Sequence, residues 1–445
     1  MKSKSRKKVY VTHCVDVEGP MEETLEATWE RIYLEDGIAI VHEPTVTNLE
    51  KLQDVNLELG VDEDMQKYLA AKYSRDNLAY LTTWEEIDEA IKEVTSSEFR
   101  QKHADMHGNP YLLNWFIYDH YGFSTNPRFH DDGIHHIWKH YHDLVLTDNK
   151  FTDGIYWHYH HPPSSGDALE WNTNIFQNGT YEEILARRVI ECHWFPSVFR
   201  AGGHIERNDL SFWLEMFIPY DFSARTPKHL SRPHGRGSVN DWRHAPTEWG
   251  FYNPDWYDYR RPGGMKRSLF RCLDLKTWIT AITSEDVKEA FEKAQAGYDA
   301  VLAYYNHDYR NMASEIEYGH TLISQVAKMY PDVEWEYINC LDAARELTGF
   351  SATDDESPVF HYEIKDSLLT VTSSTELFGP EPFLAIQEEG RFFRDNMTRE
   401  GPTEWCYYFR NPEIVKAIGM AGNTAGGKTG VKVYRGPVTG NIRST

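Results

Sequence analysis

The stretch KVYVTHCVDVEGP (residues 8–20) decides which fold the sequence predicts. Valines occupy positions 9, 11, 15 and 17, whereas the alternate positions hold Tyr10, Thr12, Cys14, Asp16 and Glu18. A period of two residues predicts a β-strand, and the Gly19-Pro20 pair that follows predicts its end. Side chains two apart on a strand leave the same face, so Asp16 and Glu18 should project together from its C-terminal end.

From residue 153 to 348, predicted strands alternate with predicted helices. Strands are expected at 154–160, 196–200, 218–224, 268–275, 299–305 and 334–339, with helices in the segments that follow. Strands that alternate with helices predict a parallel sheet covered by helices. No GxGxxG follows the first strand, and six or seven units favour a (β/α) barrel over an open Rossmann sheet.

The rest of the chain divides into two further regions. Residues 21–150 show no strand rhythm and read as a mostly helical insertion, with a capping box at Thr83 and Glu86. A polar linker at 350–358 separates the barrel unit (1–350) from short alternating strands at 356–445. This last region is expected to be a small antiparallel β domain packed on the barrel.

Composition narrows the functional class. The 445 residues carry a formal net charge of −23, which argues against a nucleic-acid partner because such affinity rests on basic patches. Five dispersed cysteines without CxxC exclude a zinc ribbon or disulfide framework. The basic N-terminus lacks a secretory apolar region, and no run of about 20 apolar residues exists. We therefore expect a cytoplasmic enzyme with no membrane span, and no oligomeric state is predicted.

Asp16 and Glu18 are the first candidate site residues. The C-terminal ends of barrel strands form the catalytic mouth. Two carboxylates on one face there repel each other unless a cation or proton lies between them. One functional interpretation is a metal ligand beside a general base, and the alternative is a solvated strand end.

The second candidate is the histidine cluster in WHYHHPP (157–163). His158 and His160 share a strand face, a geometry in which two imidazoles can bind one metal ion. His161 points the other way on an ideal strand, although the following prolines can bend it inward. A rival metal pair is His136 and His140, four residues apart in a segment (128–143) with five histidines, which otherwise line a polar rim.

Two further residues close predicted strands. Arg200 ends the strand before Gly202-Gly203 and can fix a catalytic carboxylate, or else form a surface salt bridge. His307 ends AYYNH and can act as a general acid, or else be a buried histidine bonded to backbone.

A glycine-rich motif near the C-terminus, GNTAGGKT (422–429), matches the P-loop pattern but lacks its context. A P-loop leads into a helix, whereas GVKVYRG follows here and reads as a strand. A glycine-rich hairpin is the better interpretation.

Four motifs together resemble the polysaccharide deacetylase superfamily (carbohydrate esterase family 4 and relatives). VDVEGP (15–20) is similar to a DxE variant of its first motif, and WHYHHPP to its histidine motif. FRAGG (199–203) and AYYNHD (303–308) are similar to its later arginine and histidine motifs, in the same order. The resemblance covers about 1–20 and 150–345.

The resemblance implies a distorted barrel of seven or eight strands with a divalent metal at its mouth. Zinc is the expected ion, with cobalt, manganese, nickel or iron as alternatives. Asp16 would be the base, Arg200 its orienting partner and His307 the acid, while Glu18 and two of His158, His160 and His161 would bind the metal. The expected substrate is a small molecule or oligosaccharide. Apart from the resemblance, the aromatic residues of the 242–259 loop, among them Trp242, Trp249 and Tyr252, can stack on sugar rings, or else pack in a core or loop. Arg243 and Asp308 are the further predicted substrate contacts.

The leading functional hypothesis is a metal-dependent N-deacetylase acting on a sugar or a surface-polysaccharide precursor. One alternative is a catalytically silent barrel that binds glycan or scaffolds a complex. Another is a metal hydrolase of an ester, a different amide or a glycosidic bond. Glycoside hydrolysis fits poorly, since its two carboxylates must flank the bond whereas Asp16 and Glu18 share one strand.

Overall fold

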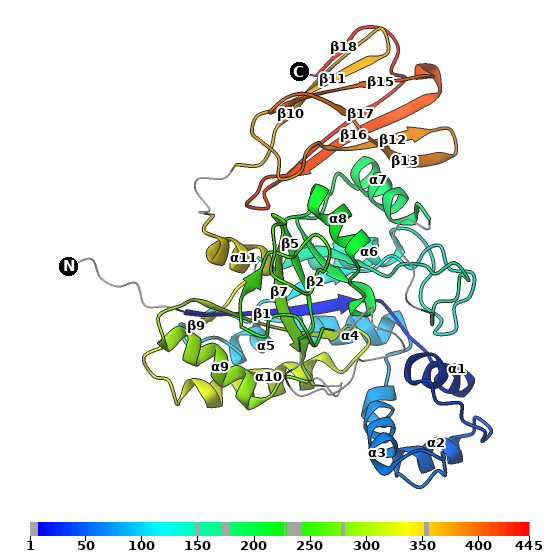
Figure 1. The fold of residues 1–445 in the computed structure, drawn as a ribbon, viewed down its shortest axis with the longest axis vertical. Helices are drawn as coiled ribbons and strands as arrows, with labels where there is room; N and C mark the ends of the chain where they lie inside the picture. Colours follow the sequence, from blue (N-terminus) through cyan, green and yellow to red (C-terminus); the bar gives the residue numbers. More distant parts are fainter. Residues whose placement is uncertain are drawn as a thin grey trace.

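The computed structural model describes residues 8–146, 152–170, 178–226, 228, 242–276, 281–350 and 356–444. Seven parallel strands close into a barrel in the order β1-β2-β3-β4-β5-β7-β8, with β8 returning to β1 (Figure 1). They are β1 (Lys8–Val17), β2 (Asn114–Ile117), β3 (Gly154–Tyr159), β4 (Val198–Ala201), β5 (Tyr220–Ala224), β7 (Ser268–Asp274) and β8 (Ala300–His307). The predicted barrel is confirmed.

Strand β1 is the longest strand of the barrel and has three partners. One edge pairs with β8 from Val9 to Asp16. The other edge pairs with β9 (Glu334–Tyr337) over Lys8–Val11 and with β2 over Cys14–Val17. All residues of β1 after Lys8 are buried, so both faces of this strand contact protein.

Helices that follow β3 in the chain cover the barrel. They are α7 (Thr180–Cys192), α8 (Asn208–Phe217), α9 (Ser284–Gln295), α10 (Met312–Ala327) and α11 (Cys340–Thr348). Helix α9 begins with a capping box between Thr283 and Asp286. Helix α7 has no side-chain cap, because the residue before its first turn is Gly179.

The segment predicted as an insertion is helical but also contributes to the barrel. Its helices are α1 (Leu25–Arg31), α2 (Val46–Gln53), α3 (Glu63–Lys72), α4 (Trp84–Thr95), α5 (Ser97–Lys102) and α6 (His136–Tyr141). The capping box at Thr83 is confirmed. Strand β2 lies within the same range, so 21–150 is not wholly an insertion. Its four residues are buried on both faces, which removes the alternation that marks a half-buried strand.

Residues 356–444 form a separate antiparallel unit, as predicted. One sheet has the order β14-β15-β11-β10-β18 and the other β13-β12-β16-β17. The strands are β10 (Phe360–Lys365), β11 (Leu368–Ser373), β12 (Phe383–Glu388), β13 (Arg391–Asp395), β14 (Thr398–Gly401), β15 (Glu404–Tyr408), β16 (Val415–Asn423), β17 (Thr429–Arg435) and β18 (Ile442–Arg443). The P-loop-like segment is the β16–β17 hairpin, and no helix follows it in the described chain up to 444.

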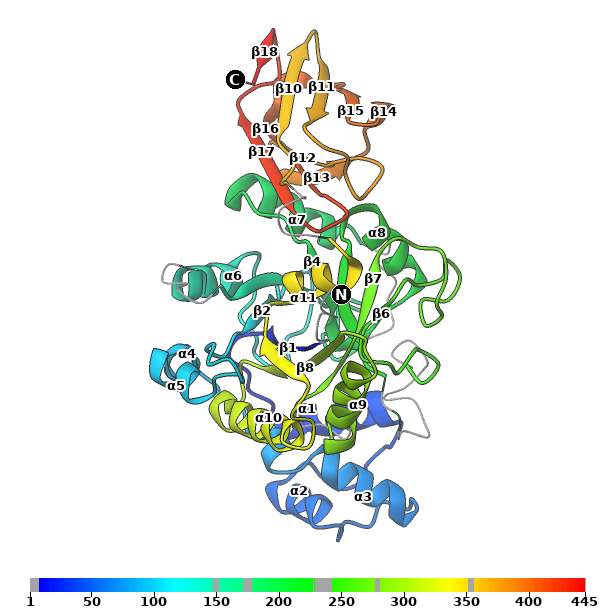
Figure 2. The ribbon, with the colours of Figure 1, turned by 90° about the vertical axis from the view of Figure 1, so that its left-hand side faces the viewer.

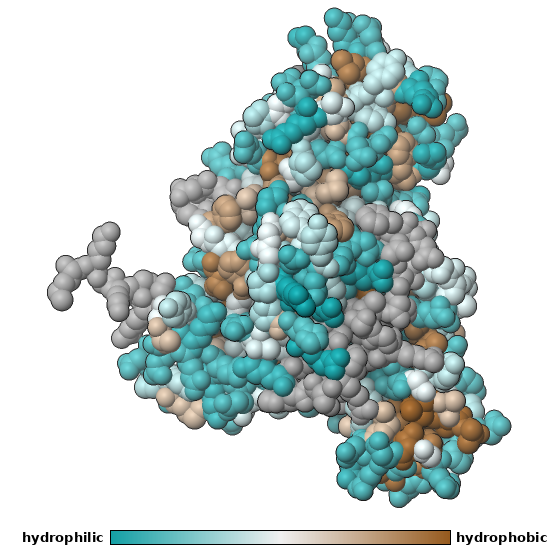
Figure 3. Space-filling model, in the orientation of Figure 1, coloured by the Kyte–Doolittle hydropathy of each residue, from teal (hydrophilic) through white to brown (hydrophobic). Residues whose placement is uncertain are grey.

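The C-terminal unit and the α2–α3 helices lie at opposite ends of the molecule, with the barrel between them (Figure 2). The unit packs on α7, where Gly419 of β16 leaves room for Val189. The face seen in Figure 3 is mostly hydrophilic, with its largest apolar area over the α1–α3 end and smaller ones elsewhere. No helix in the described ranges has both the length and the apolar character needed to cross a membrane.

Candidate metal centre

The carboxyl ends of β1, β3, β4 and β8 meet around one small cavity. Its volume is about 60 Å³, and its lining is polar apart from three aromatic or glycine positions. The lining residues are Asp16, Glu18, Glu35, Arg128, His158, His160, Gly203, His204, Arg225, Tyr305, His307 and Tyr309. Because Glu35 and Arg128 come from the 21–150 segment, this segment forms part of the wall over the barrel mouth.

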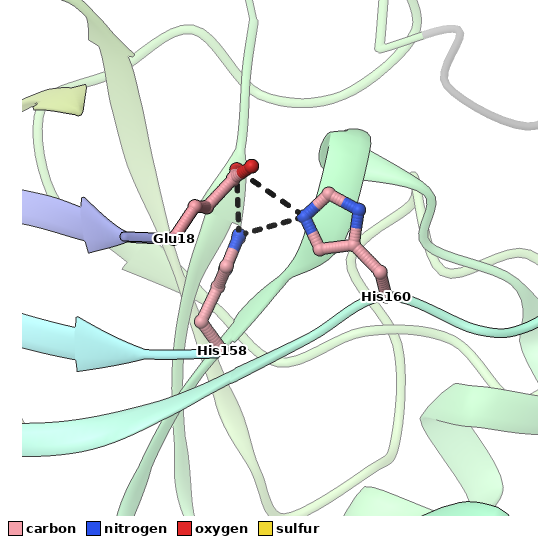
Figure 4. A group of neighbouring side chains, drawn as sticks. All are labelled: Glu18, His158 and His160. Atoms are coloured by element: carbon pink, nitrogen blue, oxygen red, sulfur yellow. Dashed lines mark hydrogen bonds and ion pairs between the residues drawn. The ribbon is translucent and has the colours of Figure 1, made fainter. Parts of the chain in front are cut away.

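Glu18, His158 and His160 point their ligand atoms at one another (Figure 4). The Oε1 atom of Glu18 lies 3.8 Å from Nε2 of His158 and 3.5 Å from Nε2 of His160. The two Nε2 atoms are 3.1 Å apart. Within the described ranges no other group of three or more His, Cys, Asp or Glu side chains converges in this way.

This spacing fits a metal ion. Zinc binds histidine nitrogen and carboxylate oxygen at about 2.0–2.2 Å, which places tetrahedral ligands about 3.3–3.6 Å apart. Nδ1 of His158 lies 3.1 Å from the carbonyl oxygen of Arg200. Because a carbonyl only accepts hydrogen bonds, the His158 proton belongs on Nδ1, which leaves the Nε2 lone pair facing the other two ligand atoms.

The charge state of Glu18 also suits a ligand. Burial alone would raise the pKa of this carboxyl, but the adjacent His160 and His158 lower it well below its usual range. The second oxygen, Oε2, lies 3.7 Å from Nε2 of His130. From the sequence, His130 is predicted only to line a polar rim, together with the other histidines of 128–143. Only the fold of the 118–135 segment brings it to Glu18.

Asp16 is paired with Arg200, as predicted. The guanidinium Nε donates to Oδ1 of Asp16 at 2.6 Å, and Nη1 donates to the carbonyl of Phe222 at 2.7 Å. The guanidinium also lies 3.8 Å from the centre of the Tyr305 ring. Arg200 is fully buried, so the alternative of a surface salt bridge does not apply.

His307 stands beside Asp16, since the two residues are register partners across β1 and β8. Its Nε2 lies 3.8 Å from Oε1 of Glu18, and its ring stacks on Tyr309 at 4.8 Å. Burial lowers the pKa of His307 to about 4. Nδ1 has no hydrogen-bond partner among the described residues, so this histidine is not the backbone-bonded kind considered as the alternative.

Asp308 does not face a substrate, which corrects its predicted role. Its two oxygens accept the backbone N–H groups of Glu18 and Gly19 at 2.9 Å each and the Tyr141 hydroxyl at 2.7 Å. Gly19 has φ +74°, a conformation that residues with side chains rarely adopt, and the Trp84 ring lies 3.0 Å from where its Cβ would be. Asp308 therefore positions the backbone that carries Glu18.

His161 lies outside the group of three ligands, contrary to its inclusion among the predicted ligands. Strand alternation continues past Tyr159, so His158 and His160 share one side and His161 takes the other. Its ring packs edge-on against Tyr159 at 4.8 Å, and neither ring nitrogen has a hydrogen-bond partner in the described chain.

The aromatic residues predicted to stack on sugar rings are buried. The indole of Trp242 donates to His204 O at 3.1 Å, and that of Trp249 to Asp286 O at 2.6 Å. The Tyr252 hydroxyl donates to Tyr259 O at 2.8 Å. These three side chains anchor their loop to the barrel and do not line the metal cavity, which favours the alternative that they pack in the core. Arg243 is exposed.

The rival metal pair separates on α6. Nδ1 of His136 faces Asp131 at 3.2 Å, and Nε2 of His140 faces Asp88 at 2.7 Å. Each histidine thus has its own carboxylate, and the two do not share a site.

Comparisons with known proteins add little to this picture. No protein-family model and no curated protein matches the chain. A Parabacteroides distasonis structure described as a glycoside hydrolase/deacetylase has 10% identity and a TM-score of 0.36, covering 88% of this chain and 86% of that one. A Cellulomonas fimi endo-β-1,4-mannanase has 11% identity and a TM-score of 0.28, covering 97% and 95%. Likenesses at this level do not bear on the chemistry of the site.

Proposed function

We propose that this chain is a metal-dependent hydrolase that removes the acetyl group from an N-acetylated sugar or surface-polysaccharide precursor. The observation that carries the proposal is the convergence of Glu18 Oε1, His158 Nε2 and His160 Nε2 at 3.1–3.8 Å, next to Asp16 and His307. A ligand set, a fixed carboxylate and an imidazole at one barrel mouth are the parts that amide hydrolysis needs.

Glu18, His158 and His160 would hold the divalent ion, which we propose to be zinc. When bound, such an ion supplies Lewis acidity toward the amide carbonyl and lowers the pKa of water. His158 keeps its Nε2 available because Nδ1 is bonded to the Arg200 carbonyl. Asp308 fixes the backbone of Glu18, so the carboxylate is held in place before any ligand arrives.

Asp16 would accept the proton of the attacking water. Arg200 fixes the Asp16 carboxylate at 2.6 Å and is itself fixed by the Phe222 carbonyl and the Tyr305 ring. A base anchored in this way loses little conformational freedom when the substrate binds, which lowers the entropic part of the activation barrier.

His307 would donate a proton to the departing amine nitrogen. Its place beside Asp16 on the neighbouring strand would let a base and an acid act on the same bond. The ring is held by Tyr309 without a hydrogen bond at Nδ1. The imidazole can therefore take up and release a proton without breaking a structural hydrogen bond.

The metal cavity is small and mostly polar, with a volume of about 60 Å³. An acetyl group is the part of the substrate that would enter it, with the sugar ring at the mouth.

Acetate release from N-acetylated mono- and oligosaccharides, measured with zinc-loaded protein, tests the proposal. We expect turnover that chelation abolishes and zinc restores. If zinc-loaded protein binds a sugar tightly but releases no acetate from any N-acetylated substrate, a glycan-binding barrel is the better description. Release of acetate only from O-acetylated substrates would make the chain an esterase instead.

A further inference from the structure

A second polar cleft lies next to the metal cavity, between the α3 end of the helical segment and the start of α10. Its volume is about 590 Å³. The lining residues are Ala71, Ser74, Asp76, Asn77, Ala79, Lys276, Arg310, Asn311, Ser314 and Glu315. This cleft is about ten times larger than the metal cavity and can hold a whole ligand moiety.

Arg310 is the unusual residue in this cleft. It is only 3% exposed, and its guanidinium lies between the rings of Tyr80 and Tyr309, 5.0 and 5.5 Å from their centres. Nη1 donates to the backbone carbonyl of Asp76 at 3.0 Å, and Nε has no hydrogen-bond partner. No carboxylate in the described part of the chain forms an ion pair with Arg310.

Seven other buried arginines in the described part of the chain each face a carboxylate. The pairs are Arg31 with Glu23, Arg100 with Asp153, Arg188 with Asp119, Arg200 with Asp16, Arg225 with Asp274, Arg267 with Asp221 and Arg271 with Asp286. Arg345 is also buried and donates to the carbonyl of Gly426 at 2.8 Å. Burying a cation costs free energy unless an anion offsets it. At Arg310 no carboxylate of the described chain does so through an ion pair, so an external anion can take that place.

Two further features of the cleft favour an anion. Helix α10 has 16 residues, and its first turn, with Asn311 as the N-cap and Ser314, lines the cleft. The N-terminus of a helix attracts negative charge. Lys276 adds a second cation, and it is exposed.

Two carboxylates also line the cleft, but neither occupies the guanidinium. Glu315 accepts the side-chain amide of Asn306 at 2.9 Å and is buried. Asp76 is exposed and offers Arg310 only its backbone carbonyl. The cleft therefore combines two cations, Arg310 and Lys276, with oxygen acceptors. This combination suits a hydroxylated ligand with one anionic group.

We propose that this cleft binds an oxyanion group, either a carboxylate or a phosphate, of a hydroxylated ligand. Tyr309 connects it to the reaction, because its ring contacts both Arg310 and His307 and lines the metal cavity. The proposed substrate is then an acidic or phosphorylated N-acetylated sugar, whose anion rests on Arg310 while its acetyl group enters the metal cavity. This last step rests on the proposed function.

Calorimetric titration with inorganic phosphate and with glucuronate tests the anion site itself. The protein is titrated both zinc-loaded and after chelation, so that anion bound to zinc is distinguished from anion bound to Arg310. We expect saturable binding of at least one probe that survives chelation. The preferred probe separates a phosphate-bearing ligand from a carboxylate-bearing one. Binding that disappears on chelation, or no saturable binding of either probe, overturns the proposal.

Two variants test whether the anion binds beside Arg310 and the first turn of α10. Arg310→Gln removes the charge and is expected to weaken the surviving binding at least about tenfold, as loss of a charge-assisted contact does. Ser314→Asp is the safer variant, because an acidic residue in the first turn suits the α10 helix while it repels an anion in the cleft. Arg443→Gln, on an exposed side chain of the C-terminal unit, is the matched control and should bind like the unaltered protein.

Acetate release then separates this inference from the proposed function. If Arg310→Gln and Ser314→Asp lose anion binding while no N-acetylated sugar is hydrolysed by any form, the anion site stands and the deacetylase proposal falls. If acetate is released from acidic and neutral sugars alike with unchanged KM in both variants, the deacetylase stands and the anion site falls.

Discussion

Strands β1 and β8 carry two polar clusters that differ in one respect. The inner cluster contains His13, which precedes Asp16 by three residues, and the side chains that bond to it directly or in turn, Asn306, Tyr111 and Glu315. Nε2 of His13 donates to Asn306 Oδ1 at 2.8 Å, and Nδ1 accepts from the Tyr111 hydroxyl at 2.9 Å. The amide of Asn306 donates to Glu315 at 2.9 Å. Each of these buried polar groups therefore has a protein partner.

The outer cluster, at the carboxyl ends of the same strands, is built from the same residue types but is not complete. Glu18, His158 and His160 converge on one point, and the Nδ1 atoms of His307 and His130 have no hydrogen-bond partner among the described residues. Burial of histidine and carboxylate side chains, which both clusters share, therefore does not mark a site by itself. What distinguishes the site is the convergence of three ligand atoms on one point.

The largest effect should come from the base. Asp16→Asn preserves shape but removes the proton acceptor, so acetate release should fall about 10²–10⁴-fold. Zinc stoichiometry should stay the same, because Asp16 is not among the three converging side chains. Steady-state kinetics with metal analysis on the same sample measures both. Full activity in Asp16→Asn would assign the base elsewhere.

The next largest effect should be on metal affinity. His160→Ala removes a ligand atom and should weaken zinc binding by more than about 100-fold, measured by competition with a chromogenic chelator. His161→Ala is the matched control, since the neighbouring residue is equally buried but faces away. Equal losses in the two variants would contradict the ligand assignment.

A smaller effect should follow from loosening the backbone of Glu18. Asp308→Asn leaves one carbonyl oxygen where two oxygens accept three hydrogen bonds. We expect zinc affinity to fall about tenfold, within the range seen for residues that support metal ligands. An unchanged affinity would show that Glu18 is held by other contacts.

The last effect should appear in the inner cluster, where it changes the dependence of stability on pH and leaves catalysis and metal affinity unaltered. Burial lowers the pKa of His13 to about 4, whereas the unfolded chain has a value near 6.5. The unfolded state therefore binds the proton first as pH falls. Stability is full above pH 6.5 and is lost on the way down to pH 4, by roughly 2 kcal/mol at pH 5.

His13→Gln should remove this part of the acid sensitivity without touching the metal centre. Thermal unfolding at pH 7 and pH 5 should show a smaller difference in Tm for the variant than for the unaltered protein, although its Tm at pH 7 is lower. An identical difference would mean that His13 is protonated in the folded protein, contrary to its fully paired geometry.

Much of this molecule follows from local patterns in the sequence. Alternation along 8–18 predicted both the strand and the shared face of Asp16 and Glu18, and alternation along 154–160 put His158 and His160 together. These predictions succeeded because strand geometry alone determines which face a side chain takes. The expectation that prolines would bend His161 inward failed, since alternation simply continued.

Other features depend on contacts between distant segments and leave no local pattern. Strand β2 is covered on both faces, so it lacks alternation. His130 reaches Glu18 across more than a hundred residues of sequence, and Trp249 is buried by α9, which follows it by some 35 residues. Aromatic composition predicted a binding surface in that loop, but the same composition also builds a core. Only the burial and the hydrogen bonds of these side chains in the folded chain distinguish a core from a binding surface.

The three partners of β1 have a consequence for synthesis of the chain. The first strand to leave the ribosome pairs with residues 300–307 and 334–337, so the barrel cannot close until about 290 further residues have been made. Pairings this distant in sequence are slow to form. Until then β1 exposes apolar edges and faces, and a nascent chain of this kind needs protection from aggregation. A product truncated before β8 would retain Asp16 and Glu18 but have no barrel mouth to hold them.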